Sequence, residues 1–176
     1  MRFAETALSG VFVIAIDAAT DERGFFARTF CEDEFARAGL AMRPTQVNLS
    51  HNTEAFTLRG LHHQAPPDGE DKVVQCVRGR IFDVAVDLRR DSPTHRRWFG
   101  IELAPDLHRM VLVPKGCAHG FLTLEPASDV VYLMAQPYVP DAARGVRWND
   151  PAFGIVWPAP PRVISPRDRA YPDYAP

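Results

Sequence analysis

The sequence predicts an all-β protein with a few short helices, organised as one domain over residues 1–176. Short apolar runs rich in β-branched residues recur roughly every ten residues along the chain. Gly or Pro stands at many breaks between these runs, which is typical of a β-sandwich or barrel. The 16 prolines also argue against a helical bundle, because each interior proline costs a helix about 3 kcal/mol.

The elements follow from this pattern in chain order. The first predicted strand covers residues 11–16, which are apolar and end at a polar cluster, and a second covers 25–30. Residues 32–38 form the one clear helical pattern, with Phe35 on its apolar side and Gly39 as its C-cap. The other predicted strands cover residues 45–49, 58–63, 72–77, 80–88, 98–103, 110–113, 120–123 and 130–135.

A proline-rich segment begins at Pro151 and predicts an irregular C-terminal tail. Trp157, Ile164 and Tyr171 lie within it, so we expect the tail to pack against the body. The sequence contains no internal repeat and no low-complexity linker, and therefore indicates no second domain.

Composition excludes several classes of partner. A net charge of -2 gives no reason to expect nucleic acid or an anionic membrane surface. No apolar run approaches the roughly 20 residues of a membrane span, and the N-terminal residues lack the apolar core of a signal peptide. We therefore expect a cytoplasmic location, without nucleic-acid or membrane partners.

The cysteines Cys31, Cys76 and Cys117 are odd in number and widely spaced. That spacing argues against a disulfide framework or a zinc knuckle. Cys76 and Cys117 lie in apolar surroundings in the sequence, so we interpret them as small packed hydrophobes.

The segment 58–64, LRGLHHQ, and the following Lys72 are the most informative part of the chain. Histidine exchanges protons near neutral pH, and Arg or Lys can hold a phosphate or a developing oxyanion. The pattern suits a site for an anionic carbonyl substrate, although histidines of a structural loop would look the same from this segment alone.

The segment 114–121, PKGCAHGF, delivers the chain into a predicted strand that begins at His119. Its Pro-x-Gly-x-x-His pattern is half of the metal-binding pattern of cupin barrels, but a hydrogen-bonded structural histidine is the simpler interpretation. The other half needs two histidines separated by one residue. His62 and His63 are adjacent, so only one can face a barrel interior. We therefore expect no metal and a metal-free cupin-like pocket.

Tyr132 and Tyr138 form a third candidate group. Tyr132 falls within a predicted strand and could be a core aromatic or a proton donor. Tyr138 follows Pro137, where the strand should have ended, and could stack on a flat ligand at a pocket mouth.

Taken in order, the motifs resemble one family, and the resemblance runs from about Asp21 to Pro172. The motifs are RGFF at 23–26, QVN at 46–48, LRGLHHQ at 58–64 with Lys72, DVAVDLR at 83–89, SPT at 92–94, PKGCAHGF at 114–121 and RWNDP at 147–151. The chain resembles the dTDP-4-dehydrorhamnose 3,5-epimerases, which are nucleotide-sugar epimerases of the cupin superfamily. The resemblance implies a cupin-type jelly-roll barrel and, as an oligomer, a homodimer.

The resemblance also implies a substrate and roles for residues. The substrate would be a nucleotide-diphospho-4-keto-6-deoxyhexose, epimerised at C3 and C5 without a cofactor, because the ketone already acidifies the neighbouring C–H groups. His62 would be the base, Asp168 its orienting partner, Lys72 the group that stabilises the C4 oxyanion, and Tyr132 the acid on the opposite face. The implied substrate-binding residues are Arg23, Phe26, Gln46, Asn48, Arg59, His119, Tyr138 and Arg167.

The chain departs from the family pattern at a few positions. Arg28 and Ala143 stand where the family usually has acids at the nucleotide end of the site, and Arg167 and Leu133 replace usual lysines. An acid-to-arginine change reverses local charge, so the same contact cannot be kept. This predicts an epimerase whose nucleotide base or sugar differs from the usual thymidine-linked one. An isomerase that inverts only C3 or only C5, and a non-catalytic sugar-binding cupin, stay open as alternatives.

Overall fold

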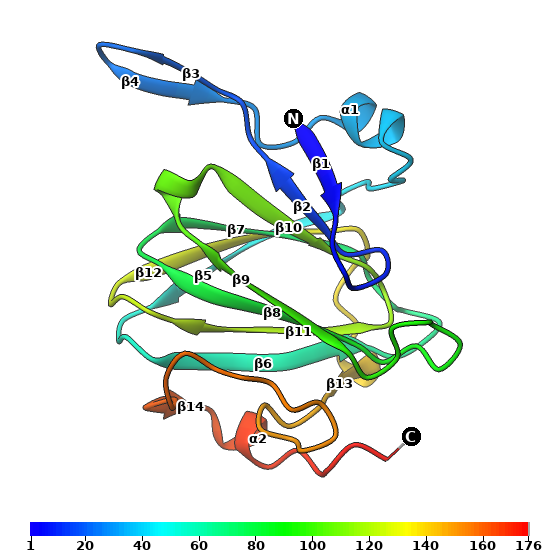
Figure 1. Ribbon diagram of the computed structural model, residues 1–176. Coiled ribbons are helices and arrows are strands. Elements are labelled where there is room, and N and C mark those ends of the chain that lie inside the picture. The colour runs from blue at the N-terminus through cyan, green and yellow to red at the C-terminus, as the bar shows by residue number, and fades with distance from the viewer. Residues whose placement is uncertain (176) are drawn as a thin grey trace.

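The computed structural model describes residues 1–175 and consists mainly of two antiparallel sheets that face each other (Figure 1). Sheet 1 contains, in spatial order, β1 (Arg2–Glu5), β2 (Phe12–Ala15), β10 (Arg109–Val113), β7 (Lys72–Arg78), β12 (Ser128–Met134) and β5 (Gln46–Asn52). Sheet 2 contains β13 (Ala143–Gly145), β6 (Thr57–Gln64), β11 (Cys117–Thr123), β8 (Ile81–Asp87) and β9 (Trp98–Leu103), and β14 (Val163–Ile164) joins β6 in parallel. This arrangement confirms the predicted all-β, cupin-type jelly-roll barrel.

The remaining elements lie outside the two sheets. β3 (Ala18–Asp21) and β4 (Gly24–Ala27) form a hairpin that projects from the barrel, at the top left in Figure 1. The helices are α1 (Glu32–Arg37), α2 (Pro166–Arg169) and the 3-10 turns η1 (Pro105–Leu107) and η2 (Pro140–Ala142). None of the helices within residues 1–175 is long and apolar enough to cross a membrane.

Three apolar clusters hold these layers together. The first lies between the sheets and includes Val74, Phe121 and Val130. The second, around Phe35 of α1, covers the outer face of sheet 1. The third covers the outer face of sheet 2, where Trp157 of the C-terminal segment packs. The expectation that the proline-rich tail packs against the body is therefore confirmed.

The end of α1 shows how one glycine stops a helix. Gly39 has φ +77, its N–H donates to the Ala36 carbonyl at 3.0 Å, and the Leu40 N–H donates to the Phe35 carbonyl at 2.9 Å. This is the paired-bond Schellman arrangement, which favours glycine because of the positive φ. The predicted role of Gly39 in ending the helix is confirmed.

Two buried thiols belong to the core rather than to any reactive site. Burial raises the pKa of Cys76 to about 11 and that of Cys117 to about 12, so both stay as thiols at neutral pH. The sequence-based interpretation of these cysteines as small hydrophobes is confirmed.

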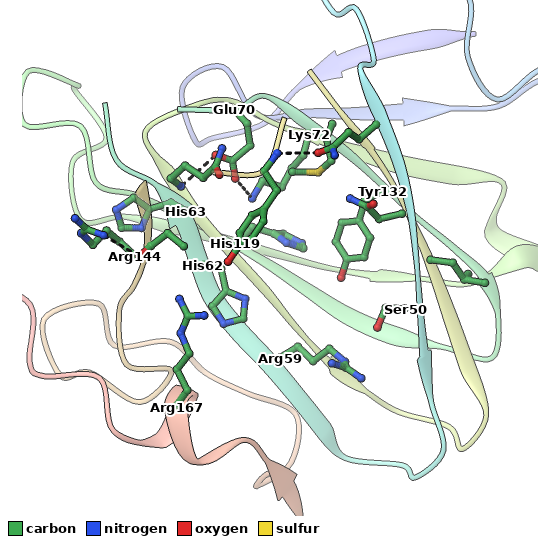
Figure 2. A pocket seen from close by; sticks show the side chains of 17 residues that line it. Ser50, Arg59, His62, His63, Glu70, Lys72, His119, Tyr132, Arg144 and Arg167 are labelled. Carbon is green, nitrogen blue, oxygen red and sulfur yellow. Dashed lines mark hydrogen bonds and ion pairs between the residues drawn. The ribbon is translucent and has the colours of Figure 1, made fainter. Parts of the chain in front are cut away.

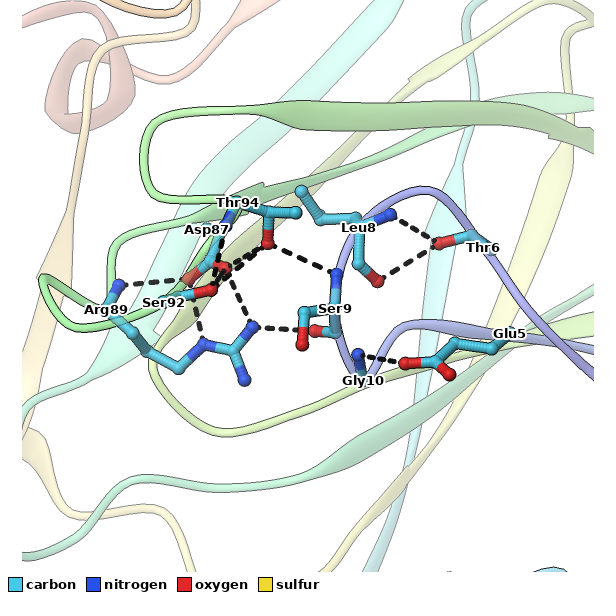
Figure 3. Close-up of polar contacts among 9 residues, drawn as sticks. All are labelled: Glu5, Thr6, Leu8, Ser9, Gly10, Asp87, Arg89, Ser92 and Thr94. Atoms are coloured by element: carbon cyan, nitrogen blue, oxygen red, sulfur yellow. Dashed lines mark hydrogen bonds and ion pairs between the residues drawn. The ribbon is translucent and has the colours of Figure 1, made fainter.

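A polar network at one end of the barrel ties the N-terminal loop to the loop after β8 (Figure 3). The fully buried Asp87 accepts hydrogen bonds from Arg89 Nε at 2.8 Å and from Thr94 Oγ1 at 2.6 Å. Arg89 Nη2 then donates to the Ser9 carbonyl at 2.6 Å. One carboxylate therefore organises two loops that are far apart in sequence.

Candidate active site

A cavity of about 590 Å³ lies between the two sheets and collects most of the predicted site residues (Figure 2). The predicted residues that line it are Gln46, Asn48, Arg59, His62, Lys72, His119, Tyr132, Tyr138 and Arg167. Lys72 and Tyr132 come from sheet 1, whereas His62 and His119 come from sheet 2. A ligand in the cavity would therefore meet ionisable groups from both sides.

His62 is held by a carboxylate from the C-terminal tail. Its Nε2 lies 2.7 Å from Asp168 Oδ1, and the imidazole is 44% exposed while Asp168 is buried. Burial alone would raise the pKa of Asp168, but hydrogen bonds from His62, the Gly60 N–H and the Ser165 end of α2 lower it below its usual range. The carboxylate stays ionised, so its hydrogen bond can orient the His62 ring.

Two glycines allow β6 and β11 to approach closely behind this pair. Gly60 has φ +135, and a Cβ there would lie 2.6 Å from the Gly120 Cα. A Cβ on Gly120 would in turn lie 2.6 Å from the Arg59 carbonyl oxygen. The Gly60 N–H donates to Asp168 Oδ2 at 3.2 Å, so the close approach also helps to fix the carboxylate.

His119 forms a second histidine–carboxylate pair, deeper in the barrel. Its Nε2 lies 2.7 Å from Asp83 Oδ2, and both side chains are buried. The strand carrying it, β11, begins at Cys117 rather than at His119 as predicted. The ring stands edge-on to Tyr132, with the centroids 6.0 Å apart.

Tyr132 points into the cavity from β12 (Figure 2). Burial raises the pKa of its phenol, the nearby Asp83 raises it further, and Arg59 offsets only part of the rise. The group therefore stays protonated at neutral pH and can donate a proton or a hydrogen bond.

Lys72 lies at the start of β7, and its ammonium has a buried partner that sequence reasoning missed. The Nζ atom is 2.7 Å from Glu70 Oε1, and the two side chains are only 6% and 4% exposed. Glu70 lies two residues before Lys72, in the connection that precedes β7.

The mouth of the cavity is formed by polar and aromatic groups. Arg59 Nε donates to Asn52 Oδ1 at 2.7 Å, and Arg167 Nε donates to the Tyr171 hydroxyl at 2.9 Å. Tyr138 is 58% exposed, and its backbone N–H donates to Gln46 Oε1 at 2.8 Å. These groups form a cationic rim with a flat aromatic surface beside it.

The structure does not bring two predicted residues to the cavity of the same chain. Arg23 pairs with Asp21 on the projecting hairpin, and Phe26 is 82% exposed there. Arg28 is also remote, because it pairs with Glu34 at 3.0 Å. Ala143, the other departure from the family pattern, does line the cavity.

The two adjacent histidines line different parts of the cavity. His62 lies beside the buried His119 in the register of β6 with β11, whereas His63 lies where the cavity continues past β6 to β13, opposite Arg144 in the strand register. The prediction that only one of them faces the barrel interior agrees with this arrangement. Burial lowers the pKa of His63, and its Nδ1 has no hydrogen-bond partner among residues 1–175. Within those residues, no group of three or more His, Cys, Asp or Glu side chains is arranged to hold a metal ion.

Comparison with known proteins places this geometry in a family. Residues 5–175 match the family described as dTDP-4-dehydrorhamnose 3,5-epimerase. The chain is 42% identical to the dTDP-4-dehydrorhamnose 3,5-epimerase of Methanothermobacter thermautotrophicus, over 96% of this chain and 91% of that protein. It is 38% identical to the dTDP-4-dehydrorhamnose 3-epimerase of Streptomyces niveus, over 96% and 82%.

The fold agrees with the sequence match. The crystal structure of dTDP-4-dehydrorhamnose 3,5-epimerase from Bacillus anthracis, with TDP and pyrophosphate bound, superposes with a TM-score of 0.95 at 39% identity. The match covers 98% of this chain and 99% of that one. The chain therefore belongs to the dTDP-4-dehydrorhamnose 3,5-epimerase family of isomerases.

Proposed function

We propose that the protein epimerises a nucleotide-diphospho-4-keto-6-deoxyhexose at C3, C5 or both, in deoxysugar biosynthesis. The observation that carries this proposal is the position of His62 and Tyr132, which reach one cavity from opposing sheets. Inversion at carbon needs a base on one face of the sugar ring and an acid on the other.

The reaction would begin with removal of a proton next to the C4 carbonyl. His62 takes the proton, Asp168 stabilises the resulting imidazolium, and the C–H electron pair moves to form an enolate. The negative charge collects on the C4 oxygen, where the Lys72 ammonium stabilises it. The ketone supplies the acidity, so the step requires no cofactor.

Inversion is completed when Tyr132 donates its phenolic proton to the opposite face of the same carbon. The enolate returns to the ketone, Tyr132 recovers a proton from water, and His62 releases its proton to water. Burial keeps the phenol of Tyr132 protonated before the step, which is the starting state that a proton donor needs.

The nucleotide diphosphate would lie at the cationic rim. Arg59 and Arg167 offer guanidinium groups that suit phosphate oxygens, and Tyr138 offers an exposed ring for a base. Ala143 lacks the carboxylate expected at the nucleotide end, which supports a base other than thymine. Thermal-shift measurements with dTDP, UDP, GDP and CDP test this, and a clear preference for dTDP would contradict the altered base.

We also infer a homodimer in which hairpin β3–β4 of one protomer reaches the cavity of its partner. The hairpin exposes Phe25 and Phe26, which are 56% and 82% exposed, and it carries Arg23 at its tip. Sedimentation equilibrium tests the assembly, and a monomer at enzyme-assay concentrations would overturn it. The expected cytoplasmic location stays a prediction.

The mechanism is tested by following deuterium incorporation from D₂O at C3 and C5 of the sugar by NMR. We expect His62→Ala to lower incorporation at both carbons on the order of 10²- to 10⁴-fold. Tyr132→Phe should keep incorporation on the face of His62 but lose inversion. Unchanged exchange in His62→Ala would instead favour a non-catalytic sugar-binding protein.

A single-position epimerase is the second candidate. It is favoured by the similarity to the 3-epimerase of Streptomyces niveus, and His62 and Tyr132 would serve it equally well. Incorporation at only one of the two carbons in the wild-type enzyme would select this candidate.

A further inference from the structure

The Glu70 carboxylate joins the two sheets at the inner wall of the cavity. Its Oε1 lies 2.7 Å from Lys72 Nζ of β7, and its Oε2 accepts the Gln64 backbone N–H of β6 at 3.1 Å. Both oxygens are therefore used, one on each sheet. Figure 2 shows Glu70 and Lys72 together on one side of the cavity, across from Arg59.

The strand end that carries one of these contacts is itself firmly held. Gln64 Nε2 donates to the Asp68 carbonyl at 2.9 Å and to the Pro137 carbonyl at 3.2 Å. Gln64 Oε1 accepts the Val139 N–H at 2.6 Å. The Glu70 carboxylate is thus anchored to a rigid point and presents its other oxygen to Lys72.

The charges that line the cavity indicate that the contact between Glu70 and Lys72 does more than fill space. Glu70 is the one carboxylate that lines the cavity among residues 1–175, whereas Arg59, Arg144 and Arg167 line it with Lys72. A buried ammonium without a counter-ion is unfavourable, and neighbouring cations make it more so. The ammonium has three N–H groups, and Glu70 occupies one of them, which fixes the direction of the others.

We propose that Glu70 is a positioning residue, which holds the Lys72 ammonium oriented toward the oxygen that becomes an oxyanion. This inference rests on the proposed function, because it assigns Glu70 a part in enolate formation at the C4 ketone. It also predicts a specific signature: loss of Glu70 affects the proton-transfer step more than nucleotide binding, and acts only through Lys72.

The test compares variants in the deuterium-exchange assay, with 4-keto-6-deoxyhexoses linked to dTDP, UDP, GDP and CDP as probes. Glu70→Gln keeps the shape and one acceptor oxygen but removes the charge. We expect it to lower the exchange rate about tenfold, less than the roughly 10²- to 10³-fold loss for removing an oxyanion-stabilising group outright, as in Lys72→Met. The Kd of the matching free nucleoside diphosphate should stay within about twofold.

A double-mutant cycle separates positioning from general damage to the fold. Combining Glu70→Gln with Lys72→Met should give the exchange rate of Lys72→Met alone, because Glu70 would have nothing left to position. Glu70→Asp is the second variant: it keeps the charge but is one methylene shorter, and should lose part of the rate. Glu125→Gln, which alters a surface pair with Arg80, is the control and should exchange like wild type.

Three results would overturn the inference. The first is a wild-type deuterium-exchange rate in Glu70→Gln. The second is an equal fold-loss of exchange rate when Glu70→Gln is made in the wild type and in Lys72→Met. The third is a loss of exchange rate accompanied by an equal loss of nucleotide affinity. These failures differ from failure of the proposed function, in which the wild-type enzyme itself exchanges deuterium at neither carbon of any probe.

Discussion

His62 and His119 each lie within hydrogen-bonding distance of a buried carboxylate, but their imidazoles differ in exposure. The pairs His62–Asp168 and His119–Asp83 both have N···O distances of 2.7 Å. The imidazole of His62 is 44% exposed, whereas that of His119 is 5% exposed. The same chemical unit is therefore suited to proton transfer in one place and to a fixed hydrogen bond in the other.

This difference predicts unequal effects of removing the two carboxylates. Asp168→Asn should lower deuterium exchange on the order of 10²-fold or more, because the amide cannot stabilise the imidazolium that the proposed mechanism forms during proton removal. Asp83→Asn should mainly weaken substrate binding, seen as a higher KM with kcat changed less. Equal losses of kcat in the two variants, measured on folded protein, would contradict the division of roles.

Residue by residue, the sequence predicted the groups that stand inside recognisable motifs and missed Glu70, which lies between two strands. His62, Lys72 and Tyr132 line the cavity as expected, because a strand carries each one. Glu70 follows a segment of proline and glycine whose path the sequence does not specify, so its contact with Lys72 was not foreseen. Phe26 lies on the projecting hairpin, away from the cavity of its own chain, a position that the sequence did not predict, because no local pattern specifies the direction in which a hairpin projects.

At the scale of elements, the short helix α2 fixes the position of the Asp168 carboxylate within the proline-rich C-terminal segment. The Ser165 Oγ accepts the Asp168 N–H at 3.0 Å, which caps the helix N-terminus. Asp168 therefore reaches His62 from a defined backbone position rather than from an open tail.

Removing this cap should disturb catalysis more than stability. Ser165→Ala costs about 1 kcal/mol locally, a Tm change of roughly 2–4 °C for a chain of this size. We expect the exchange rate to fall about tenfold, because small misplacements of a catalytic group are expensive. Ser165→Thr retains the acceptor oxygen and should behave like wild type; a rate loss as large in Ser165→Thr would count against capping as the cause.

The elements that the sequence predicted well are those with one buried face. Residues 72–77 and 130–135 alternate between the two sides of sheet 1, and the observed β7 and β12 agree with them to within two residues at each end. The missed strands β1, β3, β13 and β14 are two to four residues long and mostly exposed or half-buried. Such strands depend on pairing with distant partners, which no local pattern reveals.

For the whole molecule, the segments at both ends of the chain cover the outer faces of the two sheets and leave the cavity between them. The N-terminal loop is further attached through Ser9, Arg89 and the buried Asp87 (Figure 3). Because Asp87 connects the loop after β8 to this N-terminal loop, its ionisation should affect the unfolding of the protein as a unit.

The pH dependence of stability tests this connection. Burial alone would raise the pKa of Asp87, but hydrogen bonds from Arg89, Ser92 and Thr94 outweigh it and lower the pKa from 3.8 to about 2. A lowered carboxyl pKa stabilises the fold above pH 4, and that contribution of about 2 kcal/mol is lost as pH falls from 4 to 2. Asp87→Asn should therefore unfold about 2 kcal/mol more easily in urea at pH 7 and lose less stability than wild type between pH 4 and 2. The control is Asp91→Asn, which changes an exposed acid of the same loop and should show the wild-type dependence of unfolding free energy on pH. If Asp87→Asn and wild type lost stability equally between pH 4 and 2, the role of Asp87 would be refuted.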